Sequence, residues 1–165
     1  MTGVITIEKS LTDKIDELES VMMQYPVVDC PLHHRFIFGW YVREIFMQTG
    51  TWVTSMKHLT EHPYEVVTGK VSVFSETLGE QYLEAPYKGV TKANTRRVLY
   101  IHENCLWRTF HKIDIRPKDS SVEARIEAVR LIEDRILDKR ENPLLGGRIK
   151  NNIITKNISE CPSSR

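Results

Sequence analysis

The stretch that decides the fold is Gly50-Thr-Trp-Val-Thr-Ser-Met56-Lys-His58-Leu-Thr-Glu-His62-Pro-Tyr-Glu-Val-Val-Thr-Gly69. Each end of it is a turn signal, because glycine follows threonine there. A strand is expected inside it, over residues 52–57. Side chains two apart on a strand share a face, so Met56 and His58 point the same way, together with Trp52 and Thr54. If that face is inward, His58 faces the interior of the fold.

Short runs rich in β-branched and aromatic residues continue on both sides of this stretch, separated by turn residues. No helical pattern of about 10 to 15 residues interrupts them, which argues against parallel strands joined by helices. Many short strands predict a sandwich or a barrel. The expected strands cover residues 36–38, 40–47, 52–57, 65–67, 70–75, 81–85, 97–101 and 106–113.

Two helices are expected to flank the strands. From Ser10 to Tyr25, apolar residues recur every three or four positions with acidic residues between them. A second apolar stripe starts after Ser120 or Ser121 and ends before Pro143. The chain then divides into an N-terminal extension with an amphipathic helix (1–26), a barrel (27–115), a C-terminal helix (116–145) and a flexible tail (146–165).

The spacing of the Gly50–Gly69 stretch resembles the first conserved motif of the cupin superfamily, G(x)5HxH(x)3,4E(x)6G. Both glycines match, His58 takes the second histidine position, Met56 stands at the first, and His62 replaces the glutamate. Residues 93–103 fall where cupins carry a second motif, G(x)5PxG(x)2H(x)3N, and a loose match there puts Arg97 at the histidine. Over residues 30–113 the chain is similar to small cupin-like proteins encoded by tailed bacteriophages.

The resemblance implies a mainly β fold, a single cupin-type double-stranded β-helix (jelly-roll) barrel with flanking N-terminal and C-terminal α-helices. Such barrels leave a mouth in which one small ligand can sit. The resemblance also implies that His58, His62 and Arg97 are the polar groups of that pocket, with Met56 beside them. Cupin barrels host many unrelated functions, so the fold alone does not choose a reaction.

His58 and His62 are the candidate metal ligands, since neutral imidazole suits divalent transition metals such as Zn, Fe, Ni or Mn. A third ligand is needed, and His102, Glu61 or Glu65 could supply it. The alternative is structural: His58 would be a hydrogen-bonded barrel histidine and His62 part of a turn. His102, in an expected hairpin turn, and His111, on a late strand, could each line the pocket, and the alternative for both is a structural role.

Arg97 favours a different kind of ligand. Inside a barrel, its guanidinium would repel a cation and attract a carboxylate or phosphate through its planar fork of donors. Its neighbour Arg96 should point the other way, and the alternative for either arginine is that it serves only an exposed salt bridge. The pocket would then bind an anion.

The composition argues against several classes of protein. A net charge of +1 over 165 residues gives no basic face for nucleic acid. No run of about 18 apolar residues is present, and the N-terminus lacks the apolar segment of a signal peptide. Cys30, Cys105 and Cys161 form no CxxC pair, and their odd number favours a reducing compartment. We expect a cytoplasmic protein (host cytoplasm if phage-encoded) without nucleic-acid or membrane partners.

Three functional hypotheses follow. The leading one is a small-molecule-binding protein, a homodimer, whose anionic ligand lies in the barrel pocket with His58, His62 and Arg97. The second is a metal-dependent cupin enzyme of the dioxygenase or isomerase type that uses His58 and His62. The third is a phage-associated accessory or structural protein that acts through its C-terminal helix and tail.

Overall fold

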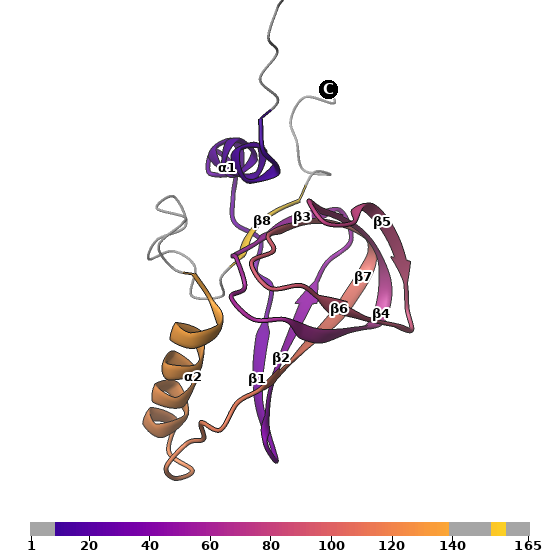
Figure 1. Ribbon diagram of the computed structural model, residues 1–165. Coiled ribbons are helices and arrows are strands. Elements are labelled where there is room, and N and C mark those ends of the chain that lie inside the picture. Colours follow the sequence, from indigo (N-terminus) through magenta and orange to yellow (C-terminus); the bar gives the residue numbers. More distant parts are fainter. Residues whose placement is uncertain (1–8, 139–152, 158–165) are drawn as a thin grey trace, which may run out of the picture.

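The computed structural model describes residues 9–138 and 153–157. Two helices lie outside a roll of strands (Figure 1). In chain order the elements are α1 (Leu11–Met22), β1 (Leu32–Ile37), β2 (Trp40–Met47), β3 (Thr51–Ser55), β4 (His62–Ser75), β5 (Gly79–Glu84), β6 (Tyr87–Thr91), β7 (Arg97–Lys112), α2 (Val122–Ile136) and β8 (Ile153–Asn157).

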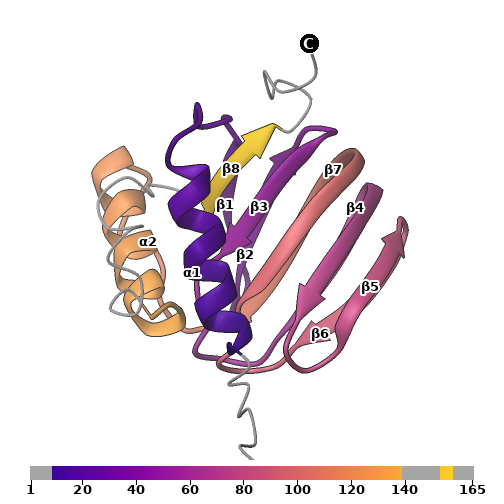
Figure 2. The ribbon, with the colours of Figure 1, turned by 90° about the horizontal axis from the view of Figure 1, so that it is seen from above.

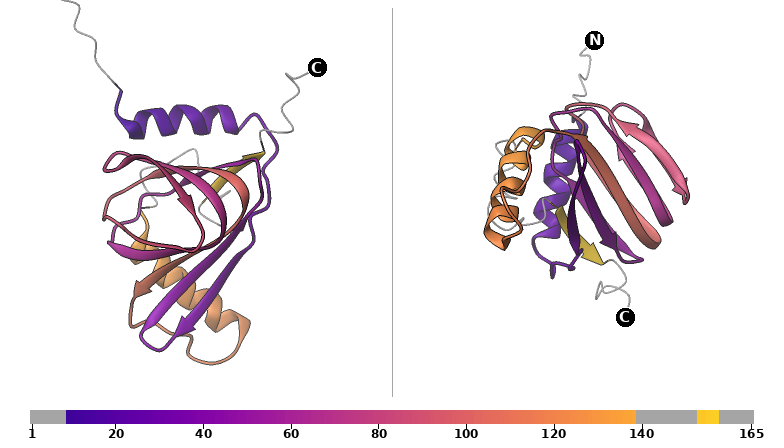
Figure 3. Two further views of the ribbon diagram at one scale, coloured as in Figure 1. Left: turned by 90° about the vertical axis from the view of Figure 1, so that its right-hand side faces the viewer. Right: turned by 90° about the horizontal axis from the view of Figure 1, so that it is seen from below.

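Two long strands, β4 and β7, build the fold, because each runs through both halves of one antiparallel sheet. They pair with each other from Tyr64 opposite Thr109 to Ser75 opposite Arg97. The first half of β4 also pairs with β6 and its second half with β5. β7 pairs with β3 near its start and with β2 near its end, and β8 and β1 extend these two halves. The sheet curves around an interior (Figures 2 and 3), so the mainly β jelly-roll barrel predicted from the sequence is confirmed.

Gly69 lies at a bulge where the sequence predicted separate turns. The register between β4 and β7 shifts around it, and its φ is +92°. A Cβ at this position would lie 2.6 Å from the carbonyl oxygen of Glu103 and closer still to that of Asn104, so only glycine fits. The hairpin turn predicted at His102 is therefore wrong. Both strands bend at the bulge and continue. The four strands predicted over residues 65–67, 70–75, 97–101 and 106–113 therefore belong to two strands, β4 and β7.

The apolar side chains form two cores. The first fills the barrel between its two halves. The second lies between the barrel and the helices, where Met22 of α1 meets Ile132 of α2, together with Tyr41 and Met56. Trp52 is partly buried against this second core. The barrel and its flanking helices are therefore packed as one unit.

Both helices begin close to their predicted starts. The Ser10 hydroxyl caps α1 and accepts a hydrogen bond from the backbone of Asp13. Ser121 caps α2, and the helix ends at Ile136, well before Pro143, because Leu137 adopts an extended conformation. Neither helix is long and apolar enough to span a membrane.

The C-terminal region differs from the flexible tail that was expected. Its backbone at Ile153–Asn157 forms β8, which pairs with β3 along its whole length, from Thr51 opposite Asn157 to Ser55 opposite Ile153. The other tail positions, and the part of the predicted C-terminal helix from 139 to 145, lie outside the described residues. These five residues therefore cover the free edge of β3.

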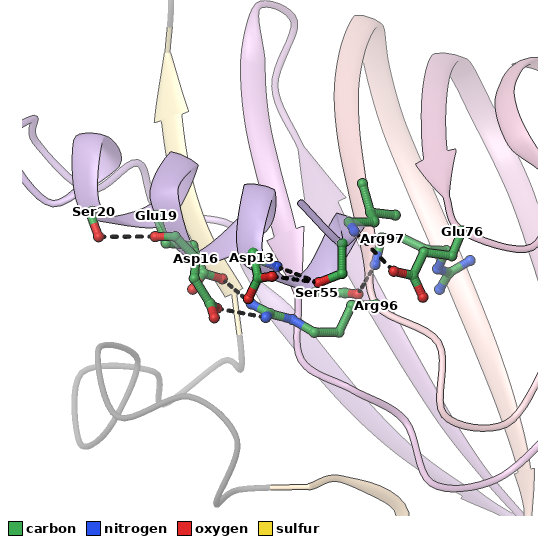
Figure 4. A network of polar contacts seen from close by, with 10 residues as sticks. Asp13, Asp16, Glu19, Ser20, Ser55, Glu76, Arg96 and Arg97 are labelled. Carbon is green, nitrogen blue, oxygen red and sulfur yellow. Dashed lines mark hydrogen bonds and ion pairs between the residues drawn. The ribbon is translucent and has the colours of Figure 1, made fainter. Parts of the chain in front are cut away.

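A buried ion pair fixes α1 to the barrel. Arg96 is 5% exposed, and its guanidinium lies 2.7 Å from Asp16 and 2.9 Å from Glu19, both on α1 (Figure 4). Glu19 is itself fully buried. Arg96 does point away from Arg97, as expected, and the salt bridge that it makes is buried, whereas the alternative considered for either arginine was an exposed one. Its neighbour Arg97 is thereby left to the barrel interior.

Candidate functional site

Three histidines from separate segments meet inside the fold. His58 lies in the loop after β3, His62 is the first residue of β4, and His111 lies near the end of β7. The loop is held from two sides, because the His58 carbonyl accepts a hydrogen bond from Asn94 and its backbone bridges to Leu137. One ring nitrogen of each histidine lies within 4.8 Å of the others, and all three side chains are buried. We call this group the histidine triad.

Each histidine of the triad has a buried ring nitrogen without a hydrogen-bond partner among the described residues: Nδ1 of His58, Nε2 of His62 and Nδ1 of His111. The Nδ1–H of His62 donates to the carbonyl oxygen of Thr60 at 2.9 Å, so its Nε2 carries the lone pair. Nε2 of His111 lies 3.1 Å from the Thr109 hydroxyl. Hydrogen bonds of this kind orient histidines that ligate metals. The triad could therefore hold a metal ion.

The surroundings of the triad favour neutral imidazoles. Burial, with Arg97 and Arg43 as further causes, lowers the pKa of His62 to about 4 against a backbone hydrogen bond that raises it. Burial also lowers the pKa of His111 to about 2 and holds the pKa of His58 well below its usual range. A neutral imidazole offers the lone pair that a metal ion needs. At neutral pH all three side chains are therefore in the ligating form.

Arg97 is a buried cation without a carboxylate partner within the described residues. Its side chain is 7% exposed, and its Nε has no hydrogen-bond partner there. The guanidinium carbon lies 5.4 Å from the ring centre of Tyr64 and 5.2 Å from that of Trp107. Burial lowers its pKa to about 10, so it remains charged at neutral pH. A buried charge that lies beside aromatic rings and has no carboxylate partner in the described part of the chain is a candidate site for an anion.

A cavity of about 70 Å³ lies between these groups. The polar side chains of its lining form two pairs: Arg43 pairs with Thr109 across β2 and β7, and the backbone N–H of Arg97 donates to the Ser55 hydroxyl at 2.9 Å. His58 lines the same cavity and connects it to the triad. The complete lining is Leu32, Arg43, Ile45, Met47, Val53, Ser55, Met56, His58, Arg97, Leu99, Trp107 and Thr109.

The apolar lining lies one level deeper. Two residues further along the same strands, Ile45 pairs with Trp107 and Val53 pairs with Leu99. Met47 follows on β2 and pairs with Cys105 of β7, close to the place where β7 bends opposite the Gly69 bulge of β4; we call this place the bulge in β7. The cavity therefore has a polar end at the arginines and His58, and an apolar end toward the bulge.

Four of the residues singled out in the sequence lie at this site, and His102 does not. His58, His62, Arg97 and Met56 all lie in the triad or the cavity lining. His102 lies on the outer face of β7, where it is exposed and its Nε2 is 2.7 Å from the Ser72 hydroxyl. It therefore does not join the other histidines, because neighbours of the buried Ile101 point outward.

The two carboxylates considered as a third ligand pair with cations elsewhere. Glu61 lies 3.7 Å from Lys92, and Glu65 lies 4.0 Å from Arg108.

The inward face of β3 also differs from the expected one: Val53 and Ser55 line the cavity. Trp52 and Thr54 alternate with them, and the alternation breaks after β3 ends at Ser55.

His111 and Arg43 complete the site, and neither was chosen from the sequence as a site residue. His111 alternates with Trp107 and Thr109 along β7, so its shared inward face was a usable signal. Arg43 is 7% exposed and lies 3.4 Å from Glu133 of α2. An isolated arginine in a strand gives no comparable signal, because its burial depends on that distant carboxylate.

Comparisons with known proteins found solved structures of similar shape but no matching family or curated protein. Among solved structures, the protein NMB1881 from Neisseria meningitidis is similar at a TM-score of 0.44, with 10% identity over 58% of this chain and 96% of that chain. An RmlC-like cupin with a double-stranded β-helix fold from Methanocaldococcus jannaschii is similar at 0.43, with 6% identity over 51% of this chain and 80% of that one. Ectoine synthase from P. lautus is similar at 0.44, with 10% identity over 65% and 78%. Likenesses of this size assign no activity, so function is argued from the site itself.

Proposed function

We propose that this protein binds a small anionic molecule in the cavity beside Arg97. The observation that carries the proposal is the buried guanidinium of Arg97, which has no carboxylate partner within the described residues. An isolated buried charge costs free energy, and a bound anion would offset that cost. Arg43 differs in this respect, because Glu133 already balances its charge. We therefore place the negative charge of the ligand beside the guanidinium of Arg97.

Calorimetric titration with formate, acetate and phosphate tests this function. We expect at least one of these anions to bind, and Arg97→Met to weaken that binding about tenfold or more, since a hydrogen bond to a charged group contributes roughly 1.5 to 3 kcal/mol. Arg130→Met is the matched control, because it removes the same charge from an exposed position on α2. Equal affinity in the wild type and Arg97→Met would refute the proposal.

A second candidate function, metal-dependent chemistry, is favoured by the histidine triad. His58, His62 and His111 would hold a divalent transition metal through one ring nitrogen each. Such an ion, when bound, polarises an oxygen ligand or lowers the pKa of a bound water. The cavity beside His58 would bring the anionic molecule next to that centre.

Elemental analysis after metal-replete purification tests the second function. We expect about one equivalent of metal in the wild type and a loss of it in His62→Gln and in His111→Gln. His102→Gln is the control, because that side chain lies on the outer face of the barrel. Retention of stoichiometric metal by both triad variants would contradict the assignment.

The homodimer, the phage origin and the cytoplasmic location stay predictions from the sequence.

A further inference from the structure

We propose that the ligand of the Arg97 cavity is a short-chain monocarboxylic acid whose carboxylate pairs with Arg97 and whose apolar chain extends toward the bulge in β7. This inference rests on the proposed anion binding and adds the chemical class of the ligand. It is carried by the two levels of the cavity wall, polar at Arg97 and Ser55 and apolar at Val53 and Leu99.

The charge balance of the cavity indicates a single negative charge. Two guanidinium groups line it, and the one on Arg43 lies 3.4 Å from a carboxylate oxygen of Glu133. Among the described residues that line the cavity, that leaves one cation, Arg97, beside two aromatic rings. A carboxylate supplies one charge and two oxygens, which match the fork of a guanidinium. A monoanion therefore neutralises the site.

The apolar end indicates an aliphatic chain. Beyond the polar level the wall consists of Ile45, Trp107, Val53, Leu99 and Met47. An anion with oxygens on all sides, such as phosphate, would place polar atoms against these side chains without hydrogen-bond partners, which costs free energy. A methylene chain would instead be removed from water there, with a gain of about fourfold in affinity for each buried methylene.

The size of the cavity limits the chain length. Its volume is about 70 Å³, and a single water needs roughly 10 to 15 Å³ on the same measure. The space therefore suits a molecule of roughly five or six non-hydrogen atoms. Butanoate has six such atoms and is the probe that we choose. Butanamide has the same shape without the charge, and formate has the charge without the chain.

Calorimetric titration of the full chain with these three probes tests the inference. We expect butanoate to bind more than tenfold tighter than formate, and butanamide to bind more than tenfold weaker than butanoate. Val53→Ile adds a methylene at the apolar end, so it should weaken butanoate binding by about fivefold or more relative to formate binding. The circular dichroism spectrum of the variant, compared with that of the wild type, shows whether the variant is folded.

The possible results separate the inference from the proposed function. Equal binding of formate and butanoate, lost in Arg97→Met, overturns the short-chain acid and keeps anion binding. Equal binding of butanamide and butanoate, or no binding of either anion, overturns both. Butanoate binding that Val53→Ile leaves unchanged overturns the placement of the chain at the apolar end.

Discussion

Replacing each of the two adjacent arginines by methionine should change stability in opposite directions. Arg97 keeps its charge in an apolar setting, and burial lowers its pKa from 12.5 to about 10. That shift corresponds to roughly 3 kcal/mol of unfavourable free energy, at 1.36 kcal/mol for each pKa unit. Its two aromatic neighbours offset part of this, by roughly 1 to 2 kcal/mol. Arg97→Met should therefore leave the free energy of unfolding unchanged or raise it by about 1 to 2 kcal/mol.

Arg96→Met removes the same charge with the opposite result. The Arg96 side chain is buried and paired with Asp16 and with Glu19, whose carboxylate is fully buried. Removing one member of a buried pair leaves the other charge without its partner and costs roughly 3 to 5 kcal/mol. For a domain of this size that loss lowers the melting temperature by roughly 10 °C. The free energies of unfolding of the two variants should therefore differ by about 3 kcal/mol or more.

Urea unfolding of both variants, followed by circular dichroism and by tryptophan fluorescence, measures this difference. Coincident transitions by the two probes are needed before free energies are compared. The reasoning is refuted if Arg97→Met loses as much stability as Arg96→Met, because its guanidinium would then have a compensating partner. Arg130→Met, on the exposed surface of α2, should stay within about 0.5 kcal/mol of the wild type.

Other perturbations test the bulge, the triad and the coupling of the two sites. Gly69→Ala should cost more than 3 kcal/mol through its clash with the Asn104 carbonyl, whereas Gly79→Ala, with φ +63° and open space, should cost only about 1 to 2 kcal/mol; equal urea midpoints would contradict this. In the metal-free protein, burial lowers the pKa of His62 to about 4 in the folded state, against 6.5 in the unfolded state. The contribution of neutral His62 to stability, up to about 3 kcal/mol, is therefore present above pH 6.5 and is lost as the pH falls toward 4. A flat profile of stability against pH over that window would count against the buried triad. Adding Zn²⁺ should raise the melting temperature of the wild type but not of His111→Gln, and a chelator should reverse the shift. Butanoate should tighten Zn²⁺ binding by the same factor as Zn²⁺ tightens butanoate binding, and unequal factors or no coupling would separate the two sites.

The sequence predicted the barrel because its strongest signals are local. Gly50 and Gly69 have φ values of +81° and +92°, so the two glycines of the motif mark positions that other residues adopt only with strain. The same local signals misled at Gly69 and His102. Each looks like a hairpin turn alone, and only the pairing of β4 with β7 makes them one bulge. Pairing between residues more than 30 positions apart is absent from any short window of sequence.

The site was predictable where one short stretch of sequence carries the pattern and not where strands distant in the sequence meet. His58 and His62 stand in one motif, whereas His111 reaches them only because β7 returns beside β4. Whether a carboxylate balances the charge of Arg97 also depends on segments that are distant in the sequence. Its neighbour Arg96 looks identical in sequence, yet one is balanced by α1 and the other is not. That difference is decided by the packing of a helix about 80 positions earlier in the chain.

The positions of Arg97 and the histidine triad impose a relation between the two candidate functions. Arg97 and Arg43 both lower the pKa of His58 and His62, so their charges would also oppose a divalent cation on the same nitrogens. Glu133 balances Arg43, but Arg97 has no such group within the described residues. A carboxylate between Arg97 and the triad would remove this repulsion and, by attraction, favour the metal. An anion in the cavity would therefore neutralise the charge of Arg97 in either of the two proposed functions.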